Sequence, residues 1–170
     1  MKHKTNNNKN MKPILIIGPE DSGKSRLAID LVGEYGSPGV VLYPALCLLR
    51  HFKTIQEELK YDMDWMSADT KTVVFDDAPV ESVKQLIQYF SEPTVKINRR
   101  MLLPLTVASP QIVITVSCTL ADLDLSAEER KGVTIFETSV NPDNYLQVQI
   151  HETNRIEGVD PYYYMSRTQT

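Results

Sequence analysis

The sequence predicts an α/β fold with a mainly parallel sheet of five strands. Short, uninterrupted apolar runs of strand length alternate along the chain with segments whose apolar residues recur at helical period. Strands that alternate with helices in this way imply a parallel sheet with right-handed crossovers. The chain has 170 residues, of which 42% are hydrophobic and 24% are charged, and this composition suits one globular domain rather than two.

The expected elements follow one another along the chain. Strands are predicted at residues 12–17, 40–43, 72–75, 111–117 and 133–136, with a terminal strand at 145–150. Helices are predicted at residues 24–35, 46–59 and 80–90. The first helix has the clearest pattern, because Leu27, Ala28, Leu31 and Val32 form an apolar stripe and Gly36 follows as a breaker.

One folded domain is expected between two tails. Residues 1–11 are rich in Asn and Lys, and we expect a disordered basic tail because such a segment buries little apolar surface. The folded domain spans residues 12–159. Residues 160–170 form a Tyr-rich tail with Tyr162, Tyr163 and Tyr164, which we interpret as docking on the same chain or as disordered, rather than as a partner site.

Charge and apolar patterning exclude several classes of function. The net charge is −4; without the four lysines among the first twelve residues it is −8, because 14 basic and 22 acidic residues remain. This acidity does not support nucleic acid binding, which would need a local basic patch or an oligomer. No apolar run approaches the roughly 20 residues of a membrane span, and no secretory signal is evident, so we expect no membrane partner and a cytoplasmic location.

The strongest motif lies directly after the first expected strand. Residues 18–25, Gly-Pro-Glu-Asp-Ser-Gly-Lys-Ser, match the phosphate-binding pattern G-x-x-x-x-G-K-[ST] in its strand-loop-helix context. Backbone N–H groups and the helix N-terminus bind phosphate in this pattern, so the sequence predicts a site for ATP. The expected nucleotide-binding residues are Gly18, Pro19, Glu20, Asp21, Ser22, Gly23, Lys24, Ser25 and Arg26.

The side chains of this loop have different expected roles. Lys24 would act on the outer phosphates as a catalytic cation, and the hydroxyl of Ser25 would ligate Mg²⁺. Glu20 and Asp21 are a complication, because two carboxylates would oppose an incoming polyphosphate unless they face solvent or a neighbouring subunit.

Paired acids after the third expected strand form a second motif. Asp76 and Asp77 follow the apolar run 72–75, at the carboxyl edge where a parallel sheet brings such residues beside the phosphate loop. Asp76 would hold Mg²⁺ through water, and Asp77 would polarise or orient the attacking water. Acidic residues are common in turns, so the acid pair indicates a magnesium nucleotide site only when it occurs together with the phosphate loop.

With these motifs, residues 13–137 resemble a P-loop NTPase of the AAA+ type, and within it the superfamily 3 helicases of viral and plasmid replication initiators. Residues 97–107 and the strand 111–117 are also similar to that family. The resemblance implies a three-layer P-loop fold with strand order 5-1-4-3-2 and a homo-oligomeric ring or partner protein. It also implies catalytic roles for Ser117, as the polar sensor contact, and for Arg130, as a finger that reaches a neighbouring subunit.

The chain departs from this family in two places. Cys118 stands where the sensor Asn is expected, so Ser117 or Thr119 would have to supply the polar contact. Only three residues separate Val107 from Gln111, which leaves no room there for the basic hairpin that grips single-stranded DNA in the family. The resemblance therefore supports an ATPase core better than a translocating helicase.

Three functions stay open at this point. A Mg²⁺-dependent ATPase is the leading one, because both motifs serve it. A small P-loop kinase also suits the length, although no arginine-rich lid is evident, and a GTPase is disfavoured because no Asn-Lys-x-Asp motif occurs. A degenerate nucleotide-binding module that does not hydrolyse is suggested by Cys118, Glu20 and Asp21.

Overall fold

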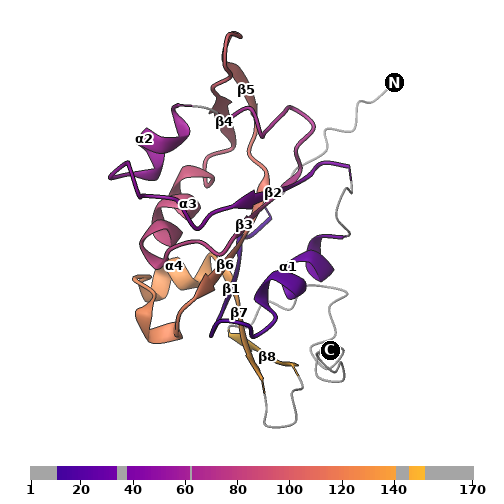
Figure 1. Cartoon of the computed structure of the whole chain (residues 1–170), viewed down its shortest axis with the longest axis vertical. Helices are drawn as coiled ribbons and strands as arrows, with labels where there is room; N and C mark the ends of the chain where they lie inside the picture. Colours follow the sequence, from indigo (N-terminus) through magenta and orange to yellow (C-terminus); the bar gives the residue numbers. More distant parts are fainter. Residues whose placement is uncertain (1–10, 34–37, 62, 141–145, 152–170) are drawn as a thin grey trace.

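A computed structural model describes residues 11–33, 38–61, 63–140 and 146–151 (Figure 1). The strands in this part of the chain are β1 (Ile14–Gly18), β2 (Val40–Pro44), β3 (Thr72–Asp76), β4 (Thr94–Ile97), β5 (Leu105–Ala108), β6 (Gln111–Ser117), β7 (Thr134–Val140) and β8 (Leu146–His151). The helices are α1 (Lys24–Val32), α2 (Ile55–Leu59), α3 (Val83–Tyr89) and α4 (Ala127–Lys131), with 3-10 turns η1 (Val80–Ser82) and η2 (Leu120–Asp122). The predicted tails at 1–11 and 160–170 lie outside the described residues, apart from Met11.

The main sheet has six strands in the order β2-β3-β6-β1-β7-β8. The first five are parallel, and β8 runs antiparallel to β7. The α/β class is thus confirmed, and the five parallel strands lie in the expected order. The sheet is mixed, because the expected terminal strand joins it as β8.

The two faces of the sheet pack against different helices. Ile14 and Ile16 of β1 point to the face covered by α1, where they meet Leu27. Leu15 and Ile17 point to the opposite face, which is covered by α3 and α4 (Figure 1). Because successive strand residues alternate between faces, a continuous apolar run such as β1 is stable only with both faces covered.

The expected helix at 46–59 is wrong over most of its length. Only Ile55–Leu59 forms α2, and it begins where the Thr54 hydroxyl accepts a hydrogen bond from Glu57 N at 3.1 Å. Before it the chain forms turns, and Leu49 adopts the left-handed φ of 64°. Leu49 N donates to Glu58 Oε2 at 2.8 Å, so the N-terminal part of the expected helix folds back onto α2.

A small antiparallel hairpin, β4–β5, was not predicted. It occupies residues 94–108 and so precedes β6, whereas the connection considered from the sequence, the three residues between Val107 and Gln111, is too short for a hairpin. Its strands alternate between exposed and buried residues, with Val95, Ile97 and Val107 in the core, but each has only four residues. Such short strands give a weak period-two signal, and the pairing becomes evident only in the structure.

No helix in the described residues is long and apolar enough to cross a membrane.

Candidate functional site

The phosphate-binding motif forms a tight loop between β1 and α1. The loop leaves the sheet at Gly18, where a Cβ atom would meet Thr138 on β7 and lie 2.7 Å from Ser22 Oγ. It enters the helix at Gly23, whose φ of 82° is in the left-handed region that glycine adopts without cost. Gly18 therefore allows the loop to lie close to Thr138 and Ser22, and Gly23 allows the backbone to turn into α1.

Buried hydroxyl groups hold the loop against the sheet. Ser22 Oγ donates to Pro19 O at 2.7 Å and lies 2.6 Å from Thr138 Oγ1. Thr138 Oγ1 in turn lies 3.3 Å from Ile17 O, to which it can donate. Ser22 and Thr138 are each only 1% exposed, so these bonds are made away from water and fix the loop before any ligand arrives.

The side chain of Lys24 turns back into the loop. Its Nζ atom donates to Pro19 O at 2.6 Å, and the residue is 7% exposed. Burial lowers the pKa of Lys24, while the nearby carboxylates of Asp77, Glu20, Asp21 and Asp76 act in the opposite direction. The ammonium of Lys24 thus lies within the loop, bonded to a loop carbonyl and close to four carboxylates.

The paired acids lie beside the start of α1. Ser25 Oγ donates to Asp76 Oδ1 at 2.7 Å. Thr115 on β6 donates to the same carboxylate oxygen at 2.8 Å and accepts a 2.8 Å bond from Asp77 N. Asp77 is exposed and has a left-handed φ of 57°, so the chain turns sharply between the two carboxylates.

These groups line a cleft of about 740 Å³ at the carboxyl edge of the sheet. Its lining residues are Glu20, Asp21, Ser22, Gly23, Lys24, Ser25, Arg26, Asp76, Asp77, Thr115 and Ser117. Most of the expected site residues therefore meet in one place. Glu20 and Asp21 are exposed, which is the arrangement in which two loop carboxylates oppose an anion least.

Arg130 does not line this cleft. It lies in the last turn of α4, whose end is held to the beginning of β1 by the bond from Lys12 Nζ to Lys131 O at 2.8 Å. Its Nη2 atom donates to Leu120 O at 3.3 Å, and its Nε atom is buried with no hydrogen-bond partner among the described residues. The structure therefore does not bring Arg130 together with the other expected site residues.

Cys118 lies directly behind the phosphate loop. It forms an isolated antiparallel bridge with Gly18 and is half-buried. Burial, with a smaller contribution from Asp122, raises the pKa of the Cys118 thiol to about 11. The thiol therefore stays neutral and is a weak hydrogen-bond donor beside the loop, whereas Ser117 next to it is exposed in the cleft.

Two residues that support the candidate site, Thr115 and Thr138, were not among the residues predicted from the sequence. Thr115 joins the two acids, and Thr138 holds Ser22. The available signal was a threonine towards the carboxyl end of each strand, but β6 and β7 carry other polar residues as well, such as Ser117 and Glu137. Threonine also has high strand propensity, so this signal alone does not separate a site residue from an ordinary strand residue.

The oxygen atoms of the site fit Mg²⁺ in the presence of phosphate. No group of three His, Cys, Asp or Glu residues that could hold a metal by itself occurs among the described residues. Mg²⁺ keeps several waters and is often bound by one or two protein oxygens together with substrate phosphates. Ser25 Oγ and Asp76 Oδ1, 2.7 Å apart, are the two oxygens here that would suit such a role.

Comparisons with known proteins support the fold alone. No protein-family model matches the chain, and no curated protein matches it either. Among solved structures, an A-form apo structure of the NrS-1 C-terminal region is similar with a TM-score of 0.53 and 14% identity. A second structure of that region has a TM-score of 0.50 and 13% identity. Each match covers 74% of this chain and 28% of the NrS-1 chain, so this chain spans under a third of that relative.

Proposed function

We propose that this chain binds ATP with Mg²⁺ and hydrolyses its γ-phosphate, on a three-layer P-loop NTPase fold of the AAA+, superfamily 3 helicase-like type. The observation that carries the proposal is the convergence of Lys24, Ser25 and Asp76 in one cleft, with Ser25 Oγ 2.7 Å from Asp76 Oδ1. A cytoplasmic location, and a role in replicating the DNA of a virus or mobile element, belong to the same proposal.

Phosphate binding would replace a contact that Lys24 makes within the loop. Among the described residues the ammonium donates to Pro19 O, and an ammonium group can donate three hydrogen bonds. An incoming phosphate would accept from Lys24 and from the backbone N–H groups at the beginning of α1. Its charge would also favour the protonated lysine and offset the lowering of the Lys24 pKa by burial.

Ser25 and Asp76 would hold Mg²⁺ between the loop and the phosphates. When bound, the metal ion supplies positive charge that stabilises the developing negative charge on the phosphate oxygens. Thr115 fixes the orientation of Asp76 through its 2.8 Å bond, so the carboxylate would need little rearrangement to face the ion.

The chemical step would be attack of water on the γ-phosphorus. The new bond joins the water oxygen to phosphorus, and the bond from phosphorus to the bridging oxygen of ADP breaks, which leaves ADP and inorganic phosphate. Asp77, exposed at the cleft, would orient the water and accept a hydrogen bond from it. Ser117 would contact the γ-phosphate from the end of β6, and Arg130 of a neighbouring subunit would stabilise the transferred charge.

A nucleotide-binding module that does not hydrolyse is the second candidate. It is favoured by the neutral Cys118 thiol at the sensor position and by the two carboxylates, Glu20 and Asp21, on the loop. Such a module would bind Mg²⁺-ATP and release no phosphate. A kinase, in contrast, would release ADP only when a phosphoryl acceptor is present.

Calorimetric titration with Mg²⁺-ATP, together with phosphate release, tests the proposal. We expect Lys24→Ala to weaken ATP binding at least tenfold, because the outer phosphates lose their cation. Lys71→Ala is the matched control, since Lys71 is exposed and does not line the cleft. Equal affinity of Lys24→Ala and the unmodified chain would refute the phosphate site, and binding without phosphate release would favour the second candidate.

A further inference from the structure

The turn of the β4–β5 hairpin exposes four consecutive apolar residues, 101–104, which we call the tip. Met101 is 103% exposed, Leu103 83% and Leu102 62%, and Pro104 beside them is exposed as well. The hairpin projects from the body of the protein at one end of its long axis (Figure 1). Contiguous exposed apolar groups are uncommon on monomeric proteins and often mark interaction sites.

The tip makes several of its backbone hydrogen bonds within the hairpin. Arg99 donates to Leu103 O from both Nε, at 3.1 Å, and Nη2, at 2.6 Å. Leu102 N donates to Arg99 O at 3.4 Å, and Pro104 has no N–H group that needs a partner. Lipid chains offer no partner to a backbone N–H or C=O group, so a tip that makes these bonds internally leaves water at a lower cost.

Two further features hold the tip in one shape. Arg100 N donates to Asp64 Oδ1 at 3.1 Å, which ties the hairpin to the segment before β3. Met101 has a left-handed φ of 54°, and non-glycine residues keep that conformation only where their surroundings impose it. The apolar tip is therefore preformed and loses little conformational freedom on binding.

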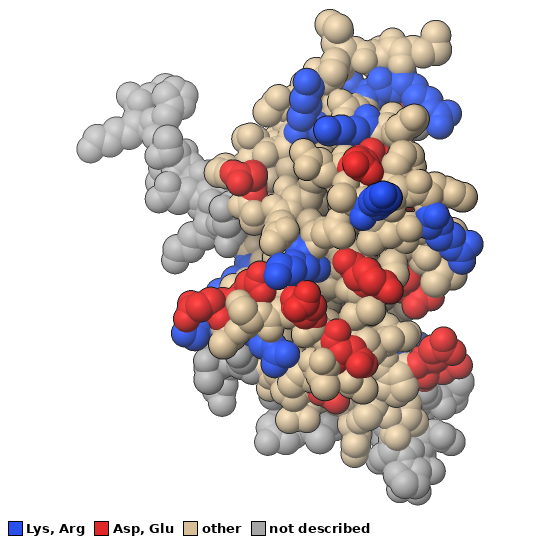
Figure 2. Space-filling view, turned by 90° about the vertical axis from the view of Figure 1, so that its left-hand side faces the viewer, with Lys and Arg blue, Asp and Glu red and all other residues tan. Residues whose placement is uncertain are grey.

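Basic residues adjoin the tip. The hairpin, residues 94–108, carries Lys96, Arg99 and Arg100 and no acidic residue. Asp64 contacts the hairpin at Arg100 N, and its carboxylate counted against the three cations leaves a charge of +2. Figure 2 shows Lys and Arg gathered near the upper end of the molecule, with uncharged atoms above them. An apolar tip beside basic residues complements a lipid bilayer with an anionic surface.

The acidity of the rest of the chain opposes such a contact only weakly. Outside the hairpin the chain has 15 basic and 22 acidic residues, a net charge of −7. Figure 2 shows most of the acidic residues of this face well below the tip. The four residues of β5 span on the order of 13 Å, which exceeds the screening length of about 8 Å at physiological salt. The basic residues of the hairpin are therefore the charges that a surface at the tip meets first.

The residue types of the hairpin favour lipid over nucleic acid or protein. No aromatic residue occurs in residues 94–108. Sites for single-stranded nucleic acid rely on aromatic side chains that stack on the bases, and the strongest contacts of protein interfaces are rich in Trp and Tyr. Met and Leu side chains bind by burying apolar surface, which is not directional and which lipid chains satisfy.

We propose that the tip, Met101–Pro104, enters the surface of an anionic lipid bilayer while Lys96 and Arg100 bind the headgroups. The expectation of no membrane partner was based on the lack of an apolar run long enough to span a bilayer, and a peripheral contact needs no span. Anionic lipids face the cytoplasm, which agrees with the proposed location. The tip does not line the cleft, so the contact is independent of ATP binding.

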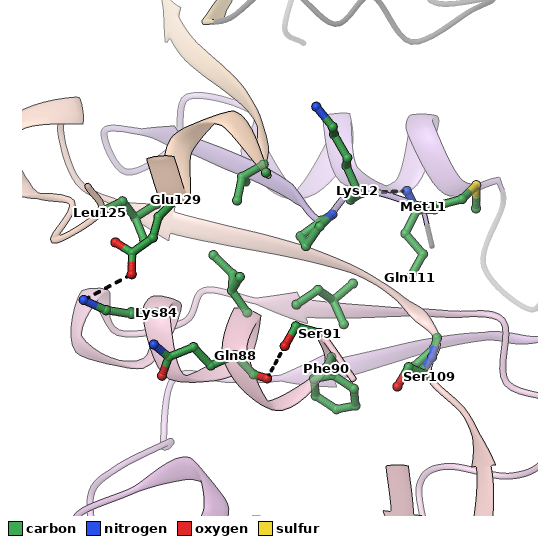
Figure 3. Close-up of a pocket in the computed structure, with 16 residues that line it drawn as sticks. Met11, Lys12, Lys84, Gln88, Phe90, Ser91, Ser109, Gln111, Leu125 and Glu129 are labelled. Carbon is green, nitrogen blue, oxygen red and sulfur yellow. Dashed lines mark hydrogen bonds and ion pairs between the residues drawn. The ribbon is translucent and has the colours of Figure 1, made fainter. Parts of the chain in front are cut away.

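An apolar pocket offers a different way to bind lipid. It has a volume of about 320 Å³ and lies at the opposite edge of the sheet from the phosphate loop (Figure 3). Ile87, Phe90 and Ile112 are among its apolar walls, and the Lys84–Glu129 ion pair, at 3.3 Å, lies beside them. A concave site of this size would take a single lipid chain rather than a bilayer surface.

Cosedimentation of the full chain with vesicles, without nucleotide, tests the contact. The vesicles contain phosphatidylcholine alone or with about 30% phosphatidylserine. The tip variant is the double substitution Met101→Ser and Leu103→Ser, and its control is Leu46→Ser at another exposed leucine. We expect the tip variant to bind phosphatidylserine vesicles about tenfold more weakly or worse, because it loses most of the apolar surface that enters the bilayer. The control should bind like the unmodified chain.

A charge variant tests the role of the basic residues. Lys96→Gln with Arg100→Gln leaves Arg99 in place to hold the tip, and Lys53→Gln with Lys71→Gln is the control with the same change of charge at other exposed positions. We expect the charge variant to lose the preference for phosphatidylserine and the control to keep it. A rise in salt from about 0.1 M to about 1 M should weaken binding of the unmodified chain.

Four results would overturn the proposal. An unmodified chain that does not bind phosphatidylserine vesicles, or a folded tip variant that binds them equally well, would refute it; circular dichroism checks the fold. Loss of vesicle binding in Gln88→Trp, which fills the mouth of the pocket, with the tip variant unaffected, would assign the lipid to the pocket. A tip variant that loses only binding to single-stranded DNA would assign the tip to nucleic acid. Lys24→Ala should bind vesicles normally, so the ATP site and the tip can fail separately.

Discussion

Ser25 Oγ donates a 2.7 Å hydrogen bond to Asp76 Oδ1, although 51 positions separate the two residues in the sequence. The bond forms because β3 and β1 flank β6 as parallel strands, so their carboxyl ends emerge at the same edge of the sheet. Thr115 on the strand between them donates to the same carboxylate oxygen. The sheet order, rather than either motif alone, thus brings a hydroxyl and a carboxylate to within ligand distance of one ion.

Ser25→Ala should remove the part of ATP affinity that depends on Mg²⁺. The variant lacks one of the two oxygens that would hold the ion, while Lys24 and the backbone N–H groups stay in place. We expect ATP affinity in Mg²⁺ to fall to the value measured in EDTA. Ser91→Ala, far from the cleft, is the control. A Mg²⁺ effect of unchanged size in Ser25→Ala would exclude Ser25 as a ligand.

Thr115→Val should destabilise the fold and disturb the acid pair. Valine has nearly the shape of threonine, but it leaves Asp77 N without its partner and Asp76 without one of its donors. We expect a loss of about 1–3 kcal/mol in the free energy of unfolding, the usual cost of an unpaired buried polar group. Urea unfolding measures it, Thr115→Ser should recover most of the hydrogen bonding, and Thr106→Val on exposed β5 should be close to neutral.

Gly18→Ala should be destabilising through overpacking. Its Cβ would meet Thr138 and Ser22 Oγ, the two hydroxyl groups that hold the loop. We expect a cost of about 1–3 kcal/mol, as for other insertions into a close-packed site. Gly132→Ala is the matched control, because its Cβ would lie 3.4 Å from the nearest atom at an ordinary φ of −82°. If thermal unfolding shows equal stability for both variants, the loop is not closely packed around Gly18.

Replacing Lys24 with Met should change how stability depends on pH. Burial lowers the pKa of Lys24 below 10.5, so between the lowered value and 10.5 the unfolded chain holds a proton that the folded chain has released. The free energy of unfolding therefore rises with pH in that window. Lys24→Met removes this contribution, and we expect urea unfolding to give a variant that is more stable than the unmodified chain below the window, with the gain disappearing towards pH 10.5. A constant difference across this pH range would argue against the charge as its cause.

Cys118 should resist alkylation in the folded protein. Its pKa of about 11, against an ordinary 9.0, leaves about a hundredfold fewer thiolates at neutral pH, and the thiolate is the reactive form. Cys47 is exposed and serves as an internal comparison within the same chain. Peptide mass analysis after brief iodoacetamide treatment should find Cys47 modified and Cys118 intact until urea is added. Equal labelling of both in the native protein would contradict the buried, neutral state of Cys118.

The parts of the fold that were predicted correctly have strong local signals. The strands β1, β3 and β6 are apolar runs rich in β-branched residues, and the structure has each within two residues of its expected bounds. The errors lie where the local signal is weak or misleading. Leucines in residues 46–49 resemble a helix, yet the Glu58 carboxylate and the Thr54 cap favour turns before α2.

The sequence by itself determined which residues could bind a phosphate, because the loop pattern and the acid pair are local and their chemistry depends on residue type. Only the tertiary structure decided how they are supported. Thr138 lies 116 residues from Ser22, and Thr115 lies 39 residues from Asp76, so their hydrogen bonds depend on strand register. The same holds for Arg130, which lies on α4 and does not line the cleft. Contacts between residues far apart in the sequence depend on how the whole chain packs, and no short-range sequence pattern specifies them.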